Sequence, residues 1–146
     1  MGLQLILVNK MRIINGTDIV ERKRIRKILH RFGKRFMEKI LSEKELKILI
    51  KFSKNNELLS EKLSNRFAAK EAAAKALGTG FTNGVRFSDL EIINDKLGKP
   101  SLYFLGRSKT LLKEVKSDYR NHGVTLSISS EKEYSVAFVS IYFFNA

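Results

Sequence analysis

The sequence has no cysteine and no tryptophan, and it has only two histidines, His30 and His122. A chain without cysteine can form neither a disulfide framework nor a thiolate metal site, and two histidines argue against a zinc site. A metal ion in this protein would therefore be held by carboxylate oxygens, which favours Mg²⁺, Mn²⁺ or Ca²⁺.

Long apolar runs are also absent. No segment approaches the ~20 apolar residues that a membrane-spanning helix needs. The apolar run at residues 3–8 is too short for the core of a signal peptide, and it has neither a basic leader nor a small-residue cleavage site. We therefore expect a cytoplasmic protein. The length of 146 residues predicts a single domain over residues 1–146.

Acidic residues are scarce relative to basic ones. Twenty-eight Lys and Arg against fifteen Asp and Glu give a formal net charge of +13. Such an excess favours a polyanionic partner. Nucleic acid, an anionic membrane, or an acidic protein together with a phosphate-rich ligand would each fit, and composition does not choose among them.

Strand and helix patterns are mixed without strict alternation, which predicts the α+β class. We expect strands at residues 11–15, 90–93, 102–105, 124–129 and 134–144, and helices at 19–32, 42–52, 55–78 and 108–119. Ser42 and Glu45 form a capping-box pattern at a helix start. The last strand is apolar on both faces toward its end, which indicates a central strand or a subunit contact.

The long helix at residues 55–78 is apolar nearly all round, with alanines on one side, which is typical of a buried helix. Ser64, Glu71 and Lys75 form a narrow polar strip on it, while Lys70 falls on its apolar stripe. The simplest interpretation of Glu71 and Lys75 is an ordinary i,i+4 ion pair. The Gly-Thr-Gly segment that follows at residues 78–80 could turn backbone N–H groups toward a phosphate, or could only end the helix.

Asp18 lies between the first strand and a basic helix. Taken alone, it is best interpreted as a helix N-cap, which is a common use of Asp. Paired in space with Glu71, it could instead hold Mg²⁺, whose other positions would be filled by water and a substrate phosphate.

At these residues the sequence resembles the bacterial holo-[acyl-carrier-protein] synthases. The segments that carry the resemblance are Asn15-Gly16-Thr17-Asp18-Ile19-Val20 and Arg66-Phe67-Ala68-Ala69-Lys70-Glu71-Ala72-Ala73-Ala74-Lys75-Ala76-Leu77-Gly78-Thr79-Gly80. Shorter matches follow in the family's order, at Arg35-Phe36, Ile40-Leu41-Ser42 with Glu45, Leu90-Glu91-Ile92, Asn94-Asp95, Gly98-Lys99-Pro100, and Leu126-Ser127-Ile128-Ser129 with Glu133-Tyr134. The similarity covers the chain from about Met11 to its end.

The resemblance implies a sheet packed on a long central helix, assembled as a homotrimer with active sites between subunits. It implies Mg²⁺-dependent transfer of 4'-phosphopantetheine from coenzyme A to a serine of apo-acyl carrier protein, which yields 3',5'-ADP and supports fatty acid biosynthesis. Asp18 and Glu71 would be the metal ligands, and Glu71 and Lys75 the catalytic residues. The serine proton would go to Glu71 or to water on the metal.

The resemblance also implies which residues bind coenzyme A and the carrier protein. Coenzyme A would contact Arg66 and Lys75, with the pocket shaped by Gly78-Thr79-Gly80 and by Gly98-Lys99-Pro100. Arg24 and Arg35 match the basic positions that meet the acidic carrier protein. On this interpretation neither nucleic acid nor a membrane is a partner.

The sequence departs from the family pattern at three places. Thr125 and Ser130 stand where the family has histidines, Asn15 stands where glycine is common, and residues 1–10 are an extension or a misassigned start. A degenerate member that binds coenzyme A but transfers poorly is therefore one alternative. The other is a basic nucleic-acid-binding module, in which the positive segment at residues 22–39 lies along phosphates.

Overall fold

The computed structural model describes residues 10–145, so the expectations for residues 3–8 and for most of 1–10 lie outside the described part. The strands are β1 (Met11–Glu21), β2 (Leu90–Asn94), β3 (Pro100–Phe104), β4 (Asn121–Ser130) and β5 (Tyr134–Phe144). The helices are α1 (Arg22–Phe32), α2 (Lys34–Ile40), α3 (Glu43–Leu49), α4 (Asn56–Ala76) and α5 (Gly106–Lys116), with short 3-10 turns η1 (Ile50–Phe52) and η2 (Phe87–Asp89). The predicted α+β class is confirmed. None of the helices within residues 10–145 has the length and apolarity needed to cross a membrane.

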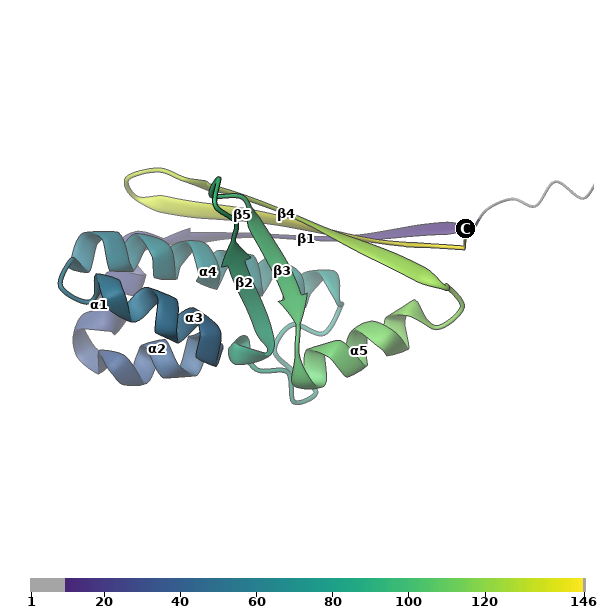
Figure 1. Ribbon diagram of the computed structural model, residues 1–146, viewed down its shortest axis with the longest axis horizontal. Coiled ribbons are helices and arrows are strands. Elements are labelled where there is room, and N and C mark those ends of the chain that lie inside the picture. The colour runs from purple at the N-terminus through teal and green to yellow at the C-terminus, as the bar shows by residue number, and fades with distance from the viewer. Residues whose placement is uncertain (1–9, 146) are drawn as a thin grey trace, which may run out of the picture.

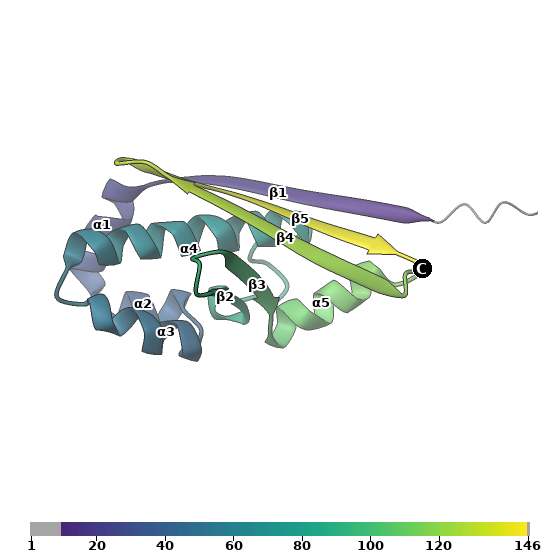
Figure 2. The same cartoon turned by 45° about the horizontal axis from the view of Figure 1, so that its top comes forward.

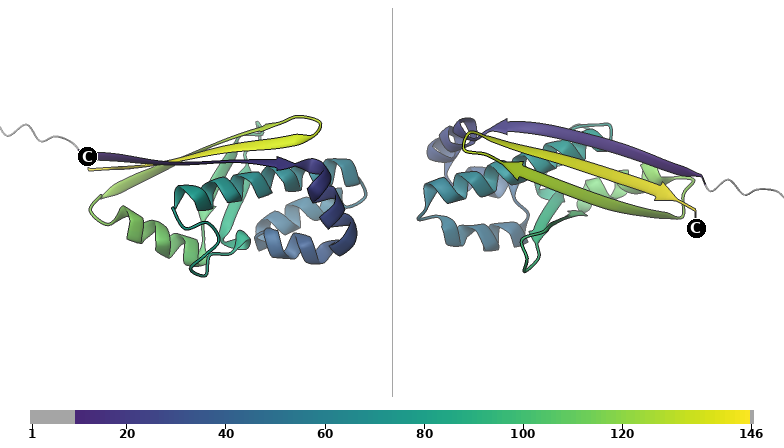
Figure 3. Two further views of the ribbon diagram at one scale, coloured as in Figure 1. Left: turned by 180° about the vertical axis from the view of Figure 1, so that it is seen from behind. Right: turned by 90° about the horizontal axis from the view of Figure 1, so that it is seen from above.

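The three long strands form an antiparallel sheet in the order β1-β5-β4, so β5 is central, as its composition predicted. Figure 3 shows the three strands side by side, with β5 between the other two. A separate antiparallel hairpin is made by β2 and β3. In Figure 1, α4 runs along one face of the sheet, α1 to α3 gather at one end of the molecule, and α5 lies toward the other end.

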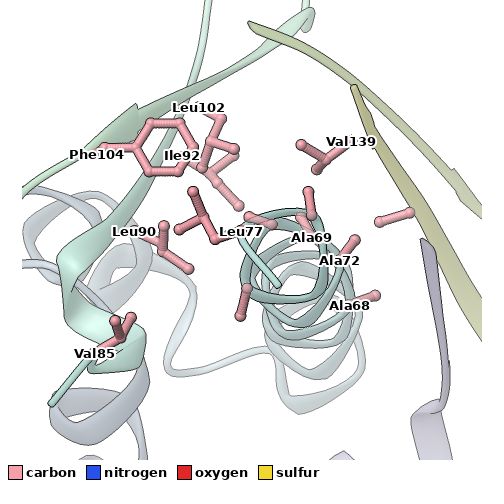
Figure 4. Packing of buried hydrophobic residues seen from close by; sticks show 14 of the residues in the cluster. Ala68, Ala69, Ala72, Leu77, Val85, Leu90, Ile92, Leu102, Phe104 and Val139 are labelled. Atoms are coloured by element: carbon pink, nitrogen blue, oxygen red, sulfur yellow. The ribbon is translucent and has the colours of Figure 1, made fainter. Parts of the chain in front are cut away.

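Helix α4 fills the space between the sheet and the β2–β3 hairpin. Figure 4 shows its alanines facing Val139 of the sheet on one side, while Leu90 and Ile92 of the hairpin approach from the other. The buried alanines are Ala68, Ala69, Ala72, Ala73, Ala74 and Ala76. The predicted alanine-lined side is therefore a packing surface, because small side chains let the strands approach the helix backbone closely.

The first strand is longer than predicted. It continues past Gly16 to Glu21, and every residue from Met11 to Glu21 pairs with β5. Gly16 does not end the strand; it lets the strand lie directly on α4, because a Cβ there would be 1.8 Å from the Ala72 carbonyl oxygen. The β-branched residues that follow, such as Ile19 and Val20, favour a strand and were the missed signal.

Other boundaries follow local chemistry. Ser42 and Glu45 form the predicted capping box, and Asn55 caps α4 by accepting from the Leu58 N–H. Helix α1 begins at Arg22 and not at residue 19, and α5 begins at Gly106 and not at 108. The basic segment at residues 22–39 is two helices, because Gly33 adopts φ +50° between them. Figure 2 shows α1 and α2 as separate helices.

Candidate functional site

Asp18 and Lys75 meet where β1 crosses α4. Lys75 Nζ lies 2.7 Å from Asp18 Oδ1 and donates a second hydrogen bond to the Thr17 carbonyl oxygen at 3.1 Å. The simple interpretations of these residues are both wrong. Asp18 lies inside a strand and caps no helix, and Lys75 forms its ion pair with Asp18, with no Glu71 pair among the described residues. The close approach of Gly16 to α4 is what brings these side chains together.

Glu71 is close enough to this pair to interact with it electrostatically. Burial, together with the negative charge of Asp18, raises the pKa of Glu71, while Lys75 and Arg24 act in the opposite direction. Two carboxylates that repel each other in a partly buried place are stabilised by a cation between them. Within residues 10–145 no group of three or more His, Asp or Glu side chains could hold a metal ion. Two carboxylates alone leave several positions for water and substrate oxygen, and this donor set fits Mg²⁺.

A groove of about 560 Å³ opens beside Glu71. It also contains Arg24 and Arg35, so the structure brings two residues predicted to bind a partner to one predicted to bind a metal. The Arg24 guanidinium carbon lies 5.9 Å from the centre of the Phe67 ring. The other lining residues are Ile28, Phe32, Phe36, Lys39, Ile40 and Phe87. The groove therefore combines a basic rim with an aromatic wall.

Sequence reasoning missed the aromatic wall and Lys39. Phe67, Phe87 and Phe81 form a continuous stack, with ring centres 5.0 Å and 3.8 Å apart along it. Phe67 lies on α4, and nothing in the helix pattern indicates that it lines a groove. Nothing in the local pattern around Phe87 distinguishes it from an ordinary core residue, because its role depends on the fold.

A second groove, of about 380 Å³, contains Arg66 together with Gly98 and Pro100. Arg66 is buried, and it donates long hydrogen bonds to Asn94 Oδ1 at 3.4 Å and to the Ile92 carbonyl oxygen at 3.5 Å. Neither Asp18 nor Glu71 lines this groove. The structure therefore groups the residues predicted to bind coenzyme A in two separate places on one chain.

The turn of the β2–β3 hairpin is held by Asp95. Its side chain accepts hydrogen bonds from the backbone N–H groups of Leu97 and Lys99, and Gly98 adopts φ +87°. The segment Gly98-Lys99-Pro100 is thus placed at the groove by turn geometry.

The glycines after α4 close the helix. Gly78 and Gly80 both adopt positive φ, and their N–H groups donate to the carbonyl oxygens of Lys75 and Ala74. Two of the three N–H groups in Gly78-Thr79-Gly80 are thus used by the helix itself, which favours the helix-stop interpretation over a phosphate cradle for these two groups.

A hollow of about 780 Å³ lies elsewhere, between α1, α2 and the start of α4. Arg26, Lys27, His30 and Lys34 line it, but it contains no carboxylate and no residue singled out as catalytic. Because the chemistry expected here needs an acidic pair, the smaller groove beside Glu71 is the candidate site.

In this α+β fold the first strand and the long helix bring two carboxylates and a lysine together beside a basic groove. The chain belongs to the 4'-phosphopantetheinyl transferase superfamily, because the profile of that family matches residues 15–139.

The chain is similar over most of its length to proteins of known name. A holo-[acyl-carrier-protein] synthase of Vibrio parahaemolyticus is 48% identical over 124 residues, which cover 85% of this chain and 92% of the relative. The holo-[acyl-carrier-protein] synthase of Buchnera aphidicola is 44% identical over 125 residues, with the same coverage.

Solved structures agree. A holo-(acyl-carrier-protein) synthase from Bacillus anthracis in complex with CoA (3',5'-ADP) has a TM-score of 0.71 and 37% identity, covering 94% of this chain and all of that one. The holo-[acyl-carrier-protein] synthase of Neisseria meningitidis has a TM-score of 0.70 and 38% identity, covering 88% of this chain and 96% of that one.

Proposed function

We propose that the protein is a cytoplasmic, Mg²⁺-dependent holo-[acyl-carrier-protein] synthase. It transfers 4'-phosphopantetheine from coenzyme A to a serine of an apo-acyl carrier protein and so supports fatty acid biosynthesis. Family membership and the names of its relatives support the activity. The observation that carries the assignment of residues is the meeting of Asp18, Glu71 and Lys75 beside a basic, aromatic groove.

In the proposed reaction the serine hydroxyl oxygen attacks the β-phosphorus of coenzyme A. A P–O bond forms to the serine, the P–O bond to 3',5'-ADP breaks, and the serine proton goes to the Glu71 carboxylate or to water. Lys75 places a positive charge at the strand–helix junction, where it stabilises negative charge on the phosphoryl oxygens. Mg²⁺ held by Asp18 and Glu71 would neutralise the charge that develops on these oxygens.

Binding of Mg²⁺ is expected to strengthen as the pH rises through the pKa of Glu71. That pKa lies above the usual 4.5, so a proton competes with the cation for the carboxylate between pH 4.5 and the raised pKa. The same shift affects folding stability when no cation is bound. The Glu71 carboxyl ionises less readily in the folded protein than in the unfolded chain, so the folded protein loses stability as the pH rises from 4.5 through the raised pKa. Calorimetric titration with Mg²⁺ at several pH values tests this, with Glu71→Gln as the control that should show weak, pH-independent binding. An affinity of the parent protein that does not change with pH would contradict it.

The carrier protein is proposed to dock at the groove beside Glu71. Arg24, Arg35 and Lys39 give this groove three basic side chains, and the chain carries a net charge of +13. An acidic partner would be attracted to this surface and its serine held near the acidic pair. The phenylalanines provide apolar area between the charges.

The functional unit is proposed to be a homotrimer whose subunits complete one another's sites. The sheet face that points away from α4, here called the outer face, exposes the apolar residues Ile13, Ile19, Tyr134, Val136 and Phe138. Phe138 is 46% exposed and Ile19 is 63% exposed, which is unusual for apolar side chains on two paired strands. Association through this face would bury these apolar side chains, and the active sites between subunits are what the family resemblance implies.

Phe138→Glu is therefore expected to give a monomer that lacks transfer activity, because a buried unpaired carboxylate at a subunit contact is costly. The measurement is mass in solution by light scattering, together with the transfer rate. Ile50→Glu is the matched control, since Ile50 is 44% exposed on η1 and away from the sheet. A monomeric Phe138→Glu variant with full activity would contradict the interfacial site.

The nucleic-acid alternative is not favoured by the geometry. Arg22, at the start of the basic segment, is buried and bonded to Glu57 and Glu61. Arg26 is paired with Glu57 as well. The segment thus presents two short helices with part of their charge neutralised, and not one continuous basic helix.

The two lost histidine positions lie on the edge strand of the sheet. Thr125 and Ser130 are both exposed on β4, and β5 separates this strand from the strand that carries Asp18. Their replacement therefore leaves the acidic pair of the same chain intact.

Incubation with coenzyme A, apo-acyl carrier protein and Mg²⁺ tests the proposed function. We expect the carrier protein to gain the mass of phosphopantetheine on a single serine, and we expect chelation of Mg²⁺ to stop the gain. An unchanged carrier protein, with tight binding of nucleic acid instead, would overturn the proposal.

A further inference from the structure

Three charged residues form a buried cluster behind the groove of Arg66. This buried ionic cluster consists of Glu45, Arg66 and Lys70, and both Glu45 and Lys70 are 0% exposed. Lys70 Nζ lies 2.6 Å from Glu45 Oε2 and donates a second hydrogen bond to the Ile40 carbonyl oxygen at 2.6 Å. Lys70 is the residue that falls on the apolar stripe of α4, and the reaction proposed above gives it no role.

The Glu45 carboxylate is shared unequally. Oε2 accepts from Lys70 and, at 2.8 Å, from the Ser42 N–H, while Oε1 accepts from the Ile92 N–H at 3.2 Å. Arg66 Nε is 3.3 Å from Oε1, but it lacks the geometry of a hydrogen bond. Lys70 therefore has the shortest contact with the carboxylate, and Arg66 has the longest.

One carboxylate faces two cations in this cluster. Burying charge is costly unless each charge is closely paired, and among the residues within ion-pair distance here the two cations outnumber the one carboxylate, while Glu91 attracts Lys70 from farther away. The remaining contacts of Arg66, with neutral oxygens of Lys62, Ile92 and Asn94, are all 3.4 to 3.5 Å long. Glu91, which accepts from the Ser42 hydroxyl at 2.8 Å, makes no ion pair with Arg66 among the described residues. The excess positive charge thus lies on a guanidinium that lines the second groove and is only loosely bonded.

We propose that Lys70 is a positioning residue that keeps Arg66 ready to bind a phosphate group. Lys70 takes the closest contact with Glu45, so the carboxylate holds the Arg66 side chain in place without neutralising it. The inference rests on the proposed function, in which Arg66 contacts a phosphate of coenzyme A. Charge-assisted hydrogen bonds from Arg to phosphate are strong because both partners are ionised. A fully paired Arg66 would make weaker ones.

Burial also affects the protonation of Lys70. It lowers the pKa of Lys70 to about 8, and the positive charge of Arg66 contributes to the lowering, while the negative charges of Glu45 and Glu91 act in the opposite direction. The two cations therefore repel each other inside one network. Removing one of them lets Glu45 pair with the other.

Calorimetric titration of coenzyme A into single and double variants tests the proposal. Lys70→Met should weaken coenzyme A binding about tenfold, because removing one charge from a low-dielectric cluster changes the field at Arg66 substantially. Arg66→Met should weaken it at least about tenfold by removing the contact itself. The double variant should bind like Arg66→Met alone, since Lys70 acts only through Arg66. In the transfer assay, Lys70→Met should raise KM for coenzyme A and leave kcat within about twofold, as expected for a change in ground-state binding.

Two controls separate the loss of the Lys70 charge from a general loss of positive charge and from a change in side-chain shape. Lys47→Met removes the same charge from the exposed i,i+4 pair with Glu43 on α3 and should leave binding unchanged. Lys70→Leu removes the same charge as Lys70→Met with a side chain of different shape, so both variants should bind coenzyme A equally weakly. Thermal unfolding confirms that each variant is folded.

The proposal is overturned if folded Lys70→Met binds coenzyme A like the parent protein, if Lys47→Met weakens binding as much, or if the effects of Lys70→Met and Arg66→Met multiply. Its failure is distinguishable from failure of the proposed function. A parent protein that transfers normally, with normal binding by Lys70→Met, overturns only this inference. If the parent protein binds coenzyme A and the single and double variants bind it as predicted, but no phosphopantetheine is transferred, only the proposed activity is overturned.

Discussion

Asp18→Ala and Glu71→Ala are each expected to lower Mg²⁺-dependent transfer by at least about a thousandfold, because each removes one of two protein ligands for the ion that stabilises the transition state. The fold should survive both changes. Asp18 and Lys75 form a partly exposed pair, and such pairs contribute less than about 1 kcal/mol to stability. Glu71 is ionised at a cost in the folded protein, so its removal relieves a repulsion with Asp18.

The measurement is the transfer rate at saturating Mg²⁺, beside thermal unfolding of each variant. Glu43→Ala is the matched control, because Glu43 is an exposed carboxylate that pairs only with Lys47 among the described residues. The control should keep the parent rate. Full activity in either Asp18→Ala or Glu71→Ala would rule out the proposed metal site.

Gly16→Ala is expected to cost about 3 kcal/mol or more of folding stability, because inserting a methyl group against packed backbone cannot be relieved by a rotamer change. The added Cβ would lie 1.8 Å from the Ala72 carbonyl oxygen and 2.7 Å from the Ala76 nitrogen. Strand β1 would have to move away from α4, and Asp18 would move with it. We therefore expect transfer activity to fall together with stability.

Gly123→Ala is the paired control for this prediction. A Cβ at Gly123 would also be too close to its neighbours, but those neighbours are the ring carbons and hydroxyl of the Tyr142 side chain, which can turn. We expect Gly123→Ala to cost less than about 1.5 kcal/mol, within the range for a change that the core can accommodate. Urea unfolding measures both variants. Equal costs at the two glycines would show that contact with the α4 backbone is not what makes Gly16 necessary.

Much of the fold could be predicted from local sequence signals. The capping box at Ser42 and the close of α4 at Gly78 depend on neighbouring residues only, and both were predicted. The end of β1 was not, because Gly16 is a turn signal locally and its use as a packing contact depends on α4, more than fifty residues away in the chain. Contacts between residues that are far apart in the chain decide where such a strand ends.

For the candidate site too, some features could be predicted from the sequence and others depend on the fold. Family resemblance pointed to Asp18, Glu71 and Lys75, and the structure places Asp18 beside Lys75 and in electrostatic contact with Glu71. The i,i+4 rule gave the wrong partner for Lys75, because a strand that lies on the helix offers a closer carboxylate. The partner of Lys70 could not be predicted either, since Glu45 lies on a different helix and becomes its neighbour only in the folded chain.

The position of Arg66 also depends on the fold. Sequence spacing places it on the same helix as Glu71, but the two side chains line different grooves. A helical separation of five residues turns a side chain by about 140°, so one helix can serve two binding places. The homotrimer proposed above is one way to bring the two binding places together.

Anomalous diffraction from crystals grown with Mn²⁺ and coenzyme A tests the central claim most directly, because Mn²⁺ prefers the same oxygen ligands as Mg²⁺ and its position can be located. We predict one Mn²⁺ peak bonded to oxygens of both Asp18 and Glu71 and in contact with the diphosphate of coenzyme A. A metal ion bound elsewhere, or one that touches only one of these carboxylates while the diphosphate is in place, would contradict the account.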